Sequence, residues 1–374
     1  MNLCRCVLGF HVEDTPLARE ESPVTTLTVP GGMDALQGID LLRQNLPAER
    51  FQLNRNYRLY RPAMKEEGEP RSSRAAILGG KNCPGDHCYA RAAILWNDGF
   101  ASCAQNVKIG VIDTDIDIKH PAFKQQNITQ RLFVPAGKQP AGNWHGTGVL
   151  ALLAGRPDSG TPGLLPGATF FAASIFYAGS DGDAVTDTVS ILRALDWMIA
   201  SGTKLVNMSF SGPQDDLVQA KIESLSANGL VFSAAAGNDG PTAEPVYPAA
   251  YPQVIAVTAV TKEFKNYPYA NRGGHIDVAA PGVDIWTAWP DSREGYRSGT
   301  SFASPFVTAV LAILPPDMLK PPKARLFEQL RTADLGAPGR DPVYGRGLLQ
   351  APASCLMASE ETVDNTHGRT ARTN

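Results

Sequence analysis

Four polar residues stand in local contexts that suit acyl transfer by a serine nucleophile. Asp113 ends an apolar, β-branched run, His145 and Ser301 each open an apolar stretch, and Asn238 follows a run of small residues. A serine hydroxyl attacks a carbonyl carbon when a histidine removes its proton, a carboxylate orients that histidine, and an amide N–H stabilises the oxyanion. The four residues are of the types that such a site needs.

Each of these residues also has a structural explanation when it is taken singly. Asp113 suits the cap of a turn after a strand, Ser301 the amino-terminal cap of a helix, and Asn238 a Gly-Asn turn. His145 is one of six histidines. Only the four contexts together favour a catalytic site.

The apolar runs that carry these residues have the length of buried strands. Strands are predicted at 107–113, 170–176, 204–210, 230–237 and 254–260, and amphipathic helices at 187–201 and 214–228. Near-continuous apolar strands that alternate with helices predict an α/β protein with a mainly parallel sheet and helices on both faces. Functional residues of such sheets gather at the carboxyl ends of the strands, which is where Asp113 and Asn238 stand.

In this order and in these contexts the residues resemble the subtilisin-like serine proteases (subtilases). That family carries the motifs D-[ST]-G, H-G-T-x-V and G-T-S-x-A-x-P. Here they read Asp113-Thr-Asp, His145-Gly-Thr-Gly-Val and Gly299-Thr-Ser301-Phe-Ala-Ser-Pro. Ala-Gly-Asn238 is similar to the Asn motif, and the resemblance extends over residues 107–353.

The resemblance implies a three-layer subtilisin-like fold and a serine endopeptidase that hydrolyses polypeptides through an acyl-enzyme. Asp113, His145 and Ser301 would be its catalytic triad, and Asn238 would hold the oxyanion. An extended peptide would add as a strand along one edge of the cleft. The substrate-binding residues implied in this way are Ser209, Phe210, Ser211, Gly212, Ala235, Ala236 and Gly237.

Two departures from the family pattern bear on the site. Asp115 replaces the usual glycine after the aspartate, which predicts an extra negative charge near the triad and activity at higher pH. Ala122 replaces an aspartate that helps to bind calcium in many relatives, so we expect no required metal or cofactor, calcium being the only metal that the resemblance suggests. Cys83, His87 and Cys88 could supply three zinc ligands, but a local disulfide or two free thiols is preferred.

The amino-terminal residues suggest a separate unit. Residues 32–62 combine a helix-like run with an alternating run and resemble the second half of the family's inhibitory propeptide, the alternative being a permanent accessory domain. Cleavage is expected between about Pro62 and Ala76, in an exposed linker. The predicted organisation is an unassigned segment 1–31, a propeptide-like unit 32–62, a linker and processing region 63–80, a catalytic domain 81–355 and a polar, disordered tail 356–374.

Composition limits the partners. The 374 residues are 43% hydrophobic with a net charge of −3, which suits a soluble globular enzyme, expected to be a monomer, and not a nucleic-acid-binding protein. No apolar run has the ~20 residues of a transmembrane helix. No signal-peptide core is visible, yet a propeptide and an even number of cysteines favour a secreted or periplasmic location.

Other classes of function fit less well. A pseudoprotease on the same fold would be favoured by loss of a triad residue, and none is lost. A nucleotide-binding protein is disfavoured because G-x-G-x-x-G and G-x-x-x-x-G-K-[ST] are both absent from the sequence. Within the proteases, a broad secreted enzyme and a dedicated processing enzyme both stay open.

Overall fold

The structure is a computed structural model that describes residues 11–15, 24–46, 51–59, 85–319 and 323–354. The linker predicted at 63–80 and the tail predicted at 356–374 lie outside the described residues. None of the described helices is long and apolar enough to cross a membrane.

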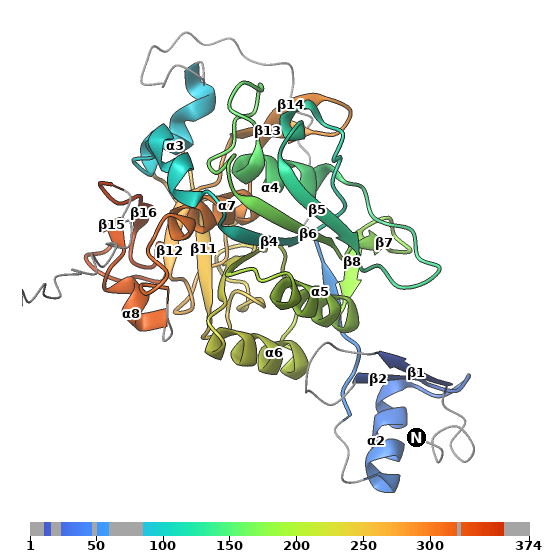
Figure 1. Cartoon of the computed structure of the whole chain (residues 1–374). Helices are drawn as coiled ribbons and strands as arrows, with labels where there is room; N and C mark the ends of the chain where they lie inside the picture. The colour runs from blue at the N-terminus through green and yellow to red at the C-terminus, as the bar shows by residue number, and fades with distance from the viewer. Residues whose placement is uncertain (1–10, 16–23, 47–50, 60–84, 320–322, 355–374) are drawn as a thin grey trace, which may run out of the picture.

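A nine-stranded sheet forms the centre of the molecule, with the order β15-β16-β12-β11-β10-β9-β4-β6-β5 (Figure 1). All neighbouring strands pair in parallel except β15 and β16, which are antiparallel. The strands are β4 (Lys108–Asp113), β5 (Asn127–Leu132), β6 (Thr169–Ser174), β9 (Leu205–Met208), β10 (Val231–Ala235), β11 (Val254–Val260), β12 (Val278–Pro281), β15 (Arg331–Ala333) and β16 (Leu348–Gln350). The predicted parallel sheet is confirmed.

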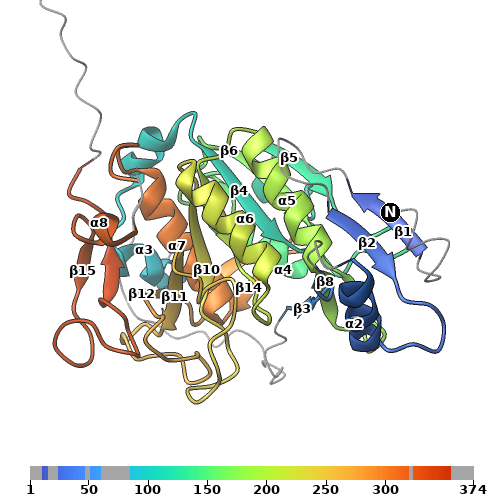
Figure 2. The same ribbon diagram turned by 90° about the horizontal axis from the view of Figure 1, so that it is seen from below.

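Helices cover both faces of this sheet and bury a separate apolar cluster on each. On one face lie α4 (Trp144–Ala154) and α7 (Thr300–Ala312), and on the other lie α5 (Thr188–Ala200) and α6 (Asp216–Ala227), which cross in front of the strands in Figure 2. Every residue of β11 is buried, as expected for a strand covered on both sides. The three-layer α/β architecture predicted from the sequence is therefore confirmed.

Local sequence explains where the surface helices begin and end. The side chain of Asp187 accepts a hydrogen bond from the N–H of Ser190 at the start of α5, and Asp215 caps α6 in the same way through Leu217 and Val218. Gly229 follows α6 with φ of +87°, a conformation that glycine adopts without strain. The predicted helices 187–201 and 214–228 thus agree with the structure to within about two residues.

The two helices nearest the candidate site are enclosed by protein. All residues of α7 are buried, and all residues of α4 after Trp144 are buried. Gly299 precedes α7 with φ of +147°, which allows a sharp entry of the chain into the helix. Enclosed helices with fixed entry points hold their first residues rigidly, and His145 and Ser301 are such residues.

Smaller elements surround this core. A hairpin of β1 (His11–Thr15) and β2 (Val24–Thr28) accompanies α2 (Ala35–Asn45), β13 (Ile285–Trp289) pairs with β14 (Arg293–Arg297), and β3 (Asn56–Arg58) joins β8 (Ala184–Asp187) and β7 (Tyr177–Ala178) in a three-stranded sheet. The remaining elements are α3 (Tyr89–Ala93), α8 (Lys323–Phe327), η1 (Gly85–Cys88), η2 (Asp98–Ala104) and η3 (Pro121–Phe123). β3, which precedes the predicted linker, is therefore paired with β8, a strand within the predicted catalytic domain.

Candidate active site

The carboxyl ends of the central strands bring the candidate residues to one edge of the sheet. Asp113 is the last residue of β4, Ser209 follows β9, and Ala235 is the last residue of β10. These three strands are neighbours and run in parallel, so their ends lie side by side. The structure thus places these candidate residues together at the carboxyl ends of the strands.

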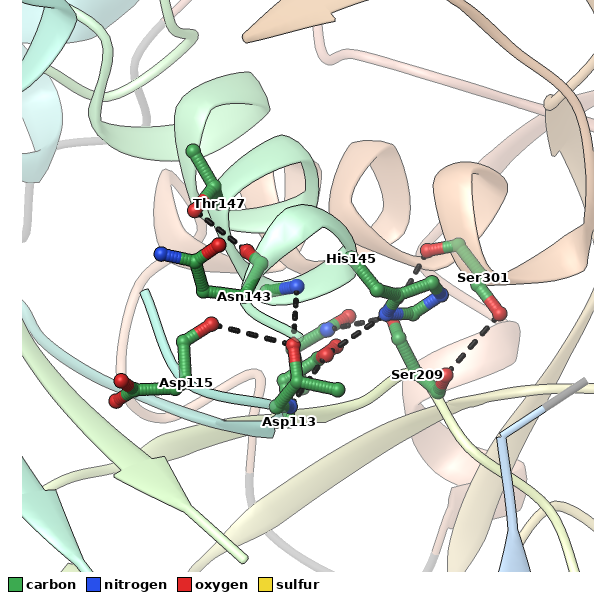
Figure 3. Close-up of polar contacts among 10 residues, drawn as sticks. Asp113, Asp115, Asn143, His145, Thr147, Ser209 and Ser301 are labelled. Atoms are coloured by element: carbon green, nitrogen blue, oxygen red, sulfur yellow. Dashed lines mark hydrogen bonds and ion pairs between the residues drawn. The ribbon is translucent and has the colours of Figure 1, made fainter. Parts of the chain in front are cut away.

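Asp113 and His145 form a buried pair. Nδ1 of His145 lies 2.7 Å from Oδ1 of Asp113, and the two side chains are 2% and 1% exposed (Figure 3). Oδ1 of Asp113 also accepts the N–H of Thr114. The hydroxyl of Thr114 accepts the N–H of Gly146, which fixes the start of α4 against the end of β4. A carboxylate at Nδ1 favours the tautomer that leaves Nε2 without a proton, as a general base requires.

Gly146 is required by the close approach of these two segments. A Cβ atom at this position would lie 2.7 Å from the carbonyl oxygen of Thr114 and 2.9 Å from that of Asp115. No real Cβ packs that closely against backbone, so any other residue would push α4 away from β4. The glycine after His145 therefore keeps the imidazole within reach of Asp113.

Ser301 is the second residue of α7, and the residue is 7% exposed. Its hydroxyl donates to the carbonyl oxygen of Ser209 at 3.0 Å, and the hydroxyl of Ser209 donates to the carbonyl oxygen of Ser301 at 2.8 Å. His145 lies next to this pair (Figure 3), and the centroid of its ring is 5.3 Å from that of Phe302. The nucleophile candidate thus rests on Ser209 in this structure.

Asn238 is oriented by the residue that precedes Ser301. Oδ1 of Asn238 accepts the N–H of Thr300 at 2.9 Å and its hydroxyl at 3.0 Å. The same hydroxyl accepts the N–H of Gly237 at 3.2 Å. Among the described residues, no acceptor contacts Nδ2 of Asn238, so this N–H group can serve an oxyanion.

A chain of buried hydroxyl and amide groups lies beneath Ser301. Nδ2 of Asn207 donates to the hydroxyl of Ser209 at 2.8 Å, and Oδ1 of Asn207 accepts the hydroxyl of Thr308 at 3.2 Å. The hydroxyls of Thr308 and Ser233 are 2.6 Å apart, and that of Ser304 reaches Ser233 at 3.3 Å. All of these side chains are almost completely buried. This hydrogen-bond network ties α7 to β9 and β10. No sequence motif contains it, because its members are spread over three elements.

The predicted substrate-binding residues divide into two groups. Gly212 pairs with Tyr247 through two backbone hydrogen bonds of 2.8 and 2.9 Å, and Ser211 forms an antiparallel bridge with Arg58. Phe210 packs beneath them, 3% exposed. Ala235 ends β10, Ala236 and Gly237 lead from it to Asn238, and all three are buried.

The strand β3 lies between two segments of the larger unit. On one side it pairs with β8, Arg58 lying opposite Val185, and on the other Arg58 bridges Ser211. Tyr57 is 1% exposed, its ring packs edge-on against that of Phe210, and a Cβ at Gly212 would overlap it. β8 and Tyr57 were not among the predicted site residues, and β8 is only four residues long.

Burial controls the titration of two tyrosines in this region. Burial raises the pKa of Tyr57 and of Tyr251 well above the usual range, so both phenols stay protonated. The hydroxyl of Tyr251 donates to the carbonyl oxygen of Asp215 and accepts its N–H. Burial also raises the pKa of Asp239, which follows Asn238.

Asp115 does not face the histidine. Its carboxylate accepts hydrogen bonds from the side chains of Gln130 and Ser174 on neighbouring strands, and Figure 3 shows it directed away from His145. The extra charge predicted from the sequence is therefore held by hydrogen bonds at the sheet edge.

The metal and thiol alternatives can be located in part. Cys88 and Cys103 are each disulfide-bonded, which removes Cys88 from a zinc site, and His87 packs against Trp286. Cys83 lies outside the described residues. Within the described ranges there is no group of three or more His, Cys, Asp or Glu side chains that could hold a metal ion. At Ala122, which replaces the aspartate that helps to bind calcium in many relatives, the backbone N–H donates to Nδ1 of His120.

Comparisons with known proteins agree with this geometry. Residues 104–346 match the profile of the subtilase family. Subtilisin E of Bacillus subtilis (strain 168) is 31% identical over 274 residues, which cover 71% of this chain and 69% of that protein. The prenylagaramide maturation protease PagA has a similar structure (TM-score 0.57, 25% identity, 67% of this chain and 94% of that one), as does a mutant of the protease domain of PatA (TM-score 0.56, 25% identity, 65% and 92%).

Proposed function

This chain belongs to the subtilase family and is a serine endopeptidase, and from that premise we propose that Asp113, His145 and Ser301 are its catalytic triad. One observation carries the proposal: the buried 2.7 Å contact between His145 and Asp113 beside Ser301 at the start of α7. We further propose that the enzyme removes its own amino-terminal unit.

The chemistry follows from the positions of the groups. The hydroxyl of Ser301 leaves the carbonyl of Ser209 by rotation about its Cα–Cβ bond and donates to Nε2 of His145. His145 takes this proton as the oxygen attacks the peptide carbonyl, and Asp113 stabilises the imidazolium that results. His145 then protonates the leaving amine, and a water molecule hydrolyses the acyl-enzyme by the same steps.

The oxyanion is stabilised by the amide of Asn238 and the backbone N–H of Ser301. Two hydrogen bonds to Thr300 hold the amide oxygen, so the amide nitrogen is presented without reorganisation. Preorganised donors of this kind contribute about 10²–10³ to turnover.

The amino-terminal unit, residues 32–62, acts in this proposal as a propeptide and intramolecular inhibitor. Support comes from β3, which is held between β8 and Ser211 as an added strand. Because Arg58 bridges Ser211 in the antiparallel sense, the chain runs from the Gly212 end of this segment toward Ser209 and Ser301. A peptide with that direction offers its carboxyl end to the nucleophile.

The remaining proposals concern the surroundings of the enzyme. Polypeptides are its substrates, and we propose that it is a monomer that needs no cofactor. The disulfide-bonded Cys88 and Cys103 support a secreted or periplasmic location, because disulfides persist in oxidising compartments.

The test is labelling with a fluorophosphonate probe, which reacts with activated serines, together with intact-mass analysis. The wild-type protein is expected to label and to lose its first ~60 to 80 residues, the range spanned by the predicted linker. Ser301→Ala is expected to do neither while it stays folded. A folded, processed wild-type protein that fails to label would favour a pseudoprotease, and a labelled, unprocessed one would favour a permanent accessory domain.

A further inference from the structure

Two carboxylates converge on the side chain of Arg58. Asp181 and Asp183 lie in the turn between β7 and β8, and Nη1 of Arg58 is 3.6 Å from a carboxylate oxygen of each. The side chains of Asp181, Asp183 and Arg58 are partly exposed, at 50%, 31% and 66%. The arginine therefore contacts both carboxylates at the surface of the protein, where solvent reaches it.

The backbone of the turn is built to hold this arrangement. The N–H of Gly179 donates to the carbonyl oxygen of Asp183 at 2.7 Å, and the N–H of Gly182 donates to that of Gly179 at 3.1 Å. Gly182 has φ of +79°, which closes the turn without strain. Arg58 lies opposite Val185, and Asp183 precedes Val185 by two residues, so Asp183 is the diagonal neighbour on the same side of the strand pair.

The position of Arg58 can be related to the bond that is cut. Arg58 bridges Ser211 in the antiparallel sense, so a peptide bound in the same register has the residue two places later opposite Ser209. The carbonyl oxygen of Ser209 accepts the hydroxyl of Ser301 at 3.0 Å. The residue opposite Ser209 is therefore the one whose carbonyl is attacked, which we call P1, and the residue in the place of Arg58 is P3.

We propose that Asp181 and Asp183 form a subsite that selects arginine or lysine at P3 of polypeptide substrates. This inference rests on the proposed function, because it takes β3 as bound in the manner of a substrate. The carboxylates attract a basic side chain and repel an acidic one. Since the side chain of Arg58 stays 66% exposed, selection at P3 depends on charge and not on enclosure in a pocket.

The size of the effect follows from the exposure of the groups. A single exposed ion pair changes an equilibrium by roughly 1.5- to 5-fold, because water screens it. Two carboxylates acting on one cation should give a preference of about 3- to 10-fold in kcat/KM for arginine over glutamine at P3. The kcat/KM for a peptide with glutamate at P3 should be lower than that for the peptide with glutamine. The preference should shrink at high ionic strength, where the Debye length falls to a few ångströms.

The experiment uses the full chain after self-processing, with active enzyme counted by fluorophosphonate titration. Fluorogenic peptides Tyr-Xaa-Leu-Tyr, which copy the sequence from Tyr57 onward, carry Arg, Lys, Gln or Glu at Xaa. The variants are Asp181→Asn, Asp183→Asn and the double variant, and the matched control is Asp317→Asn, which removes an exposed carboxylate elsewhere on the surface.

We expect the wild-type enzyme and the control to prefer arginine and lysine, each single variant to lose part of this preference, and the double variant to treat all four peptides within about twofold. An Arg-to-Gln ratio below about twofold in the wild type, or an unchanged ratio in the double variant, would overturn the inference while the proposed function stands. Failure of the wild type to label with the probe and to cut any peptide would remove the proposed function and this subsite with it.

Discussion

Thr300 offers a direct test of how Asn238, the proposed oxyanion donor, is held. Its hydroxyl donates to Oδ1 of Asn238 at 3.0 Å and accepts the N–H of Gly237 at 3.2 Å, while its own N–H donates to the same Oδ1 at 2.9 Å. Thr300→Val keeps the shape and the backbone N–H but removes the hydroxyl. The amide of Asn238 then keeps one of its two contacts with Thr300.

The magnitudes follow from what each change removes. Asn238→Ala deletes the donor itself and should lower kcat by about 10²–10³. Thr300→Val only loosens the donor, so we expect kcat to fall about 3- to 10-fold, which corresponds to about 0.6–1.4 kcal/mol in the barrier. KM should change little, because the contact with the oxyanion is made in the transition state. The N–H of Gly237 loses an acceptor in a buried site, which should lower stability by about 1–2 kcal/mol.

The assay is steady-state hydrolysis of a fluorogenic peptide by probe-titrated enzyme, with thermal unfolding of the same samples. Thr300→Ser is the control, since it keeps the hydroxyl. The decisive variant combines Asn238→Ala with Thr300→Val. If Thr300 acts by positioning Asn238, the double variant should have the kcat of Asn238→Ala within about twofold. Losses that multiply would refute a positioning role, and a normal kcat with reduced stability in Thr300→Val would leave Thr300 a structural residue only.

Three further predictions concern other parts of the molecule. Gly212→Ala adds a Cβ that overlaps the ring of Tyr57. When it is introduced into the unprocessed Ser301→Ala protein, limited proteolysis should release the amino-terminal unit faster than from Ser301→Ala alone. Equal rates of release would contradict this. Asn207→Leu removes one hydrogen-bond partner from each of two buried hydroxyls, those of Ser209 and Thr308. It should cost about 2–4 kcal/mol in thermal unfolding and lower kcat more than it raises KM. Burial lowers the pKa of His275, so below about pH 6.5 the native state binds fewer protons than the unfolded state. The melting temperature should therefore fall as the pH is lowered from about 7 to 5.5, and it should fall less in His275→Gln.

Sequence patterns predicted the central fold because the sheet is buried on both faces. A strand such as β11, with every residue buried, has to be a continuous apolar run, and its length separates it from a helix. The caps of α5 and α6 are local features, so their boundaries were close. The end of β4 at Asp113 also follows from the sequence, since the apolar run stops there.

Elements that depend on distant partners were not predicted. β5 lies at the edge of the sheet with mostly exposed residues, so Asn127–Leu132 carries no apolar pattern. β7 and β8 are two and four residues long and exist through their pairing with each other and with β3. The hairpin of β1 and β2 falls in the segment that was left unassigned. Short strands of this kind have no local signal that distinguishes them from loops.

The candidate reactive groups lie in local sequence motifs, whereas the groups that position them depend on contacts between distant segments. A nucleophile, a base and an oxyanion donor sit in motifs, because each needs a fixed backbone around it, and a fixed backbone constrains neighbouring residues. Thr300 lies inside such a motif, yet Asn207, Ser233 and Thr308 stand on three separate elements, and only the packing of α7 on β9 and β10 joins them. The proposed subsite of Asp181 and Asp183 likewise depends on contacts between distant segments. Its residues lie in a surface turn that a motif search passes over, which is why specificity in this enzyme has to be sought in the structure.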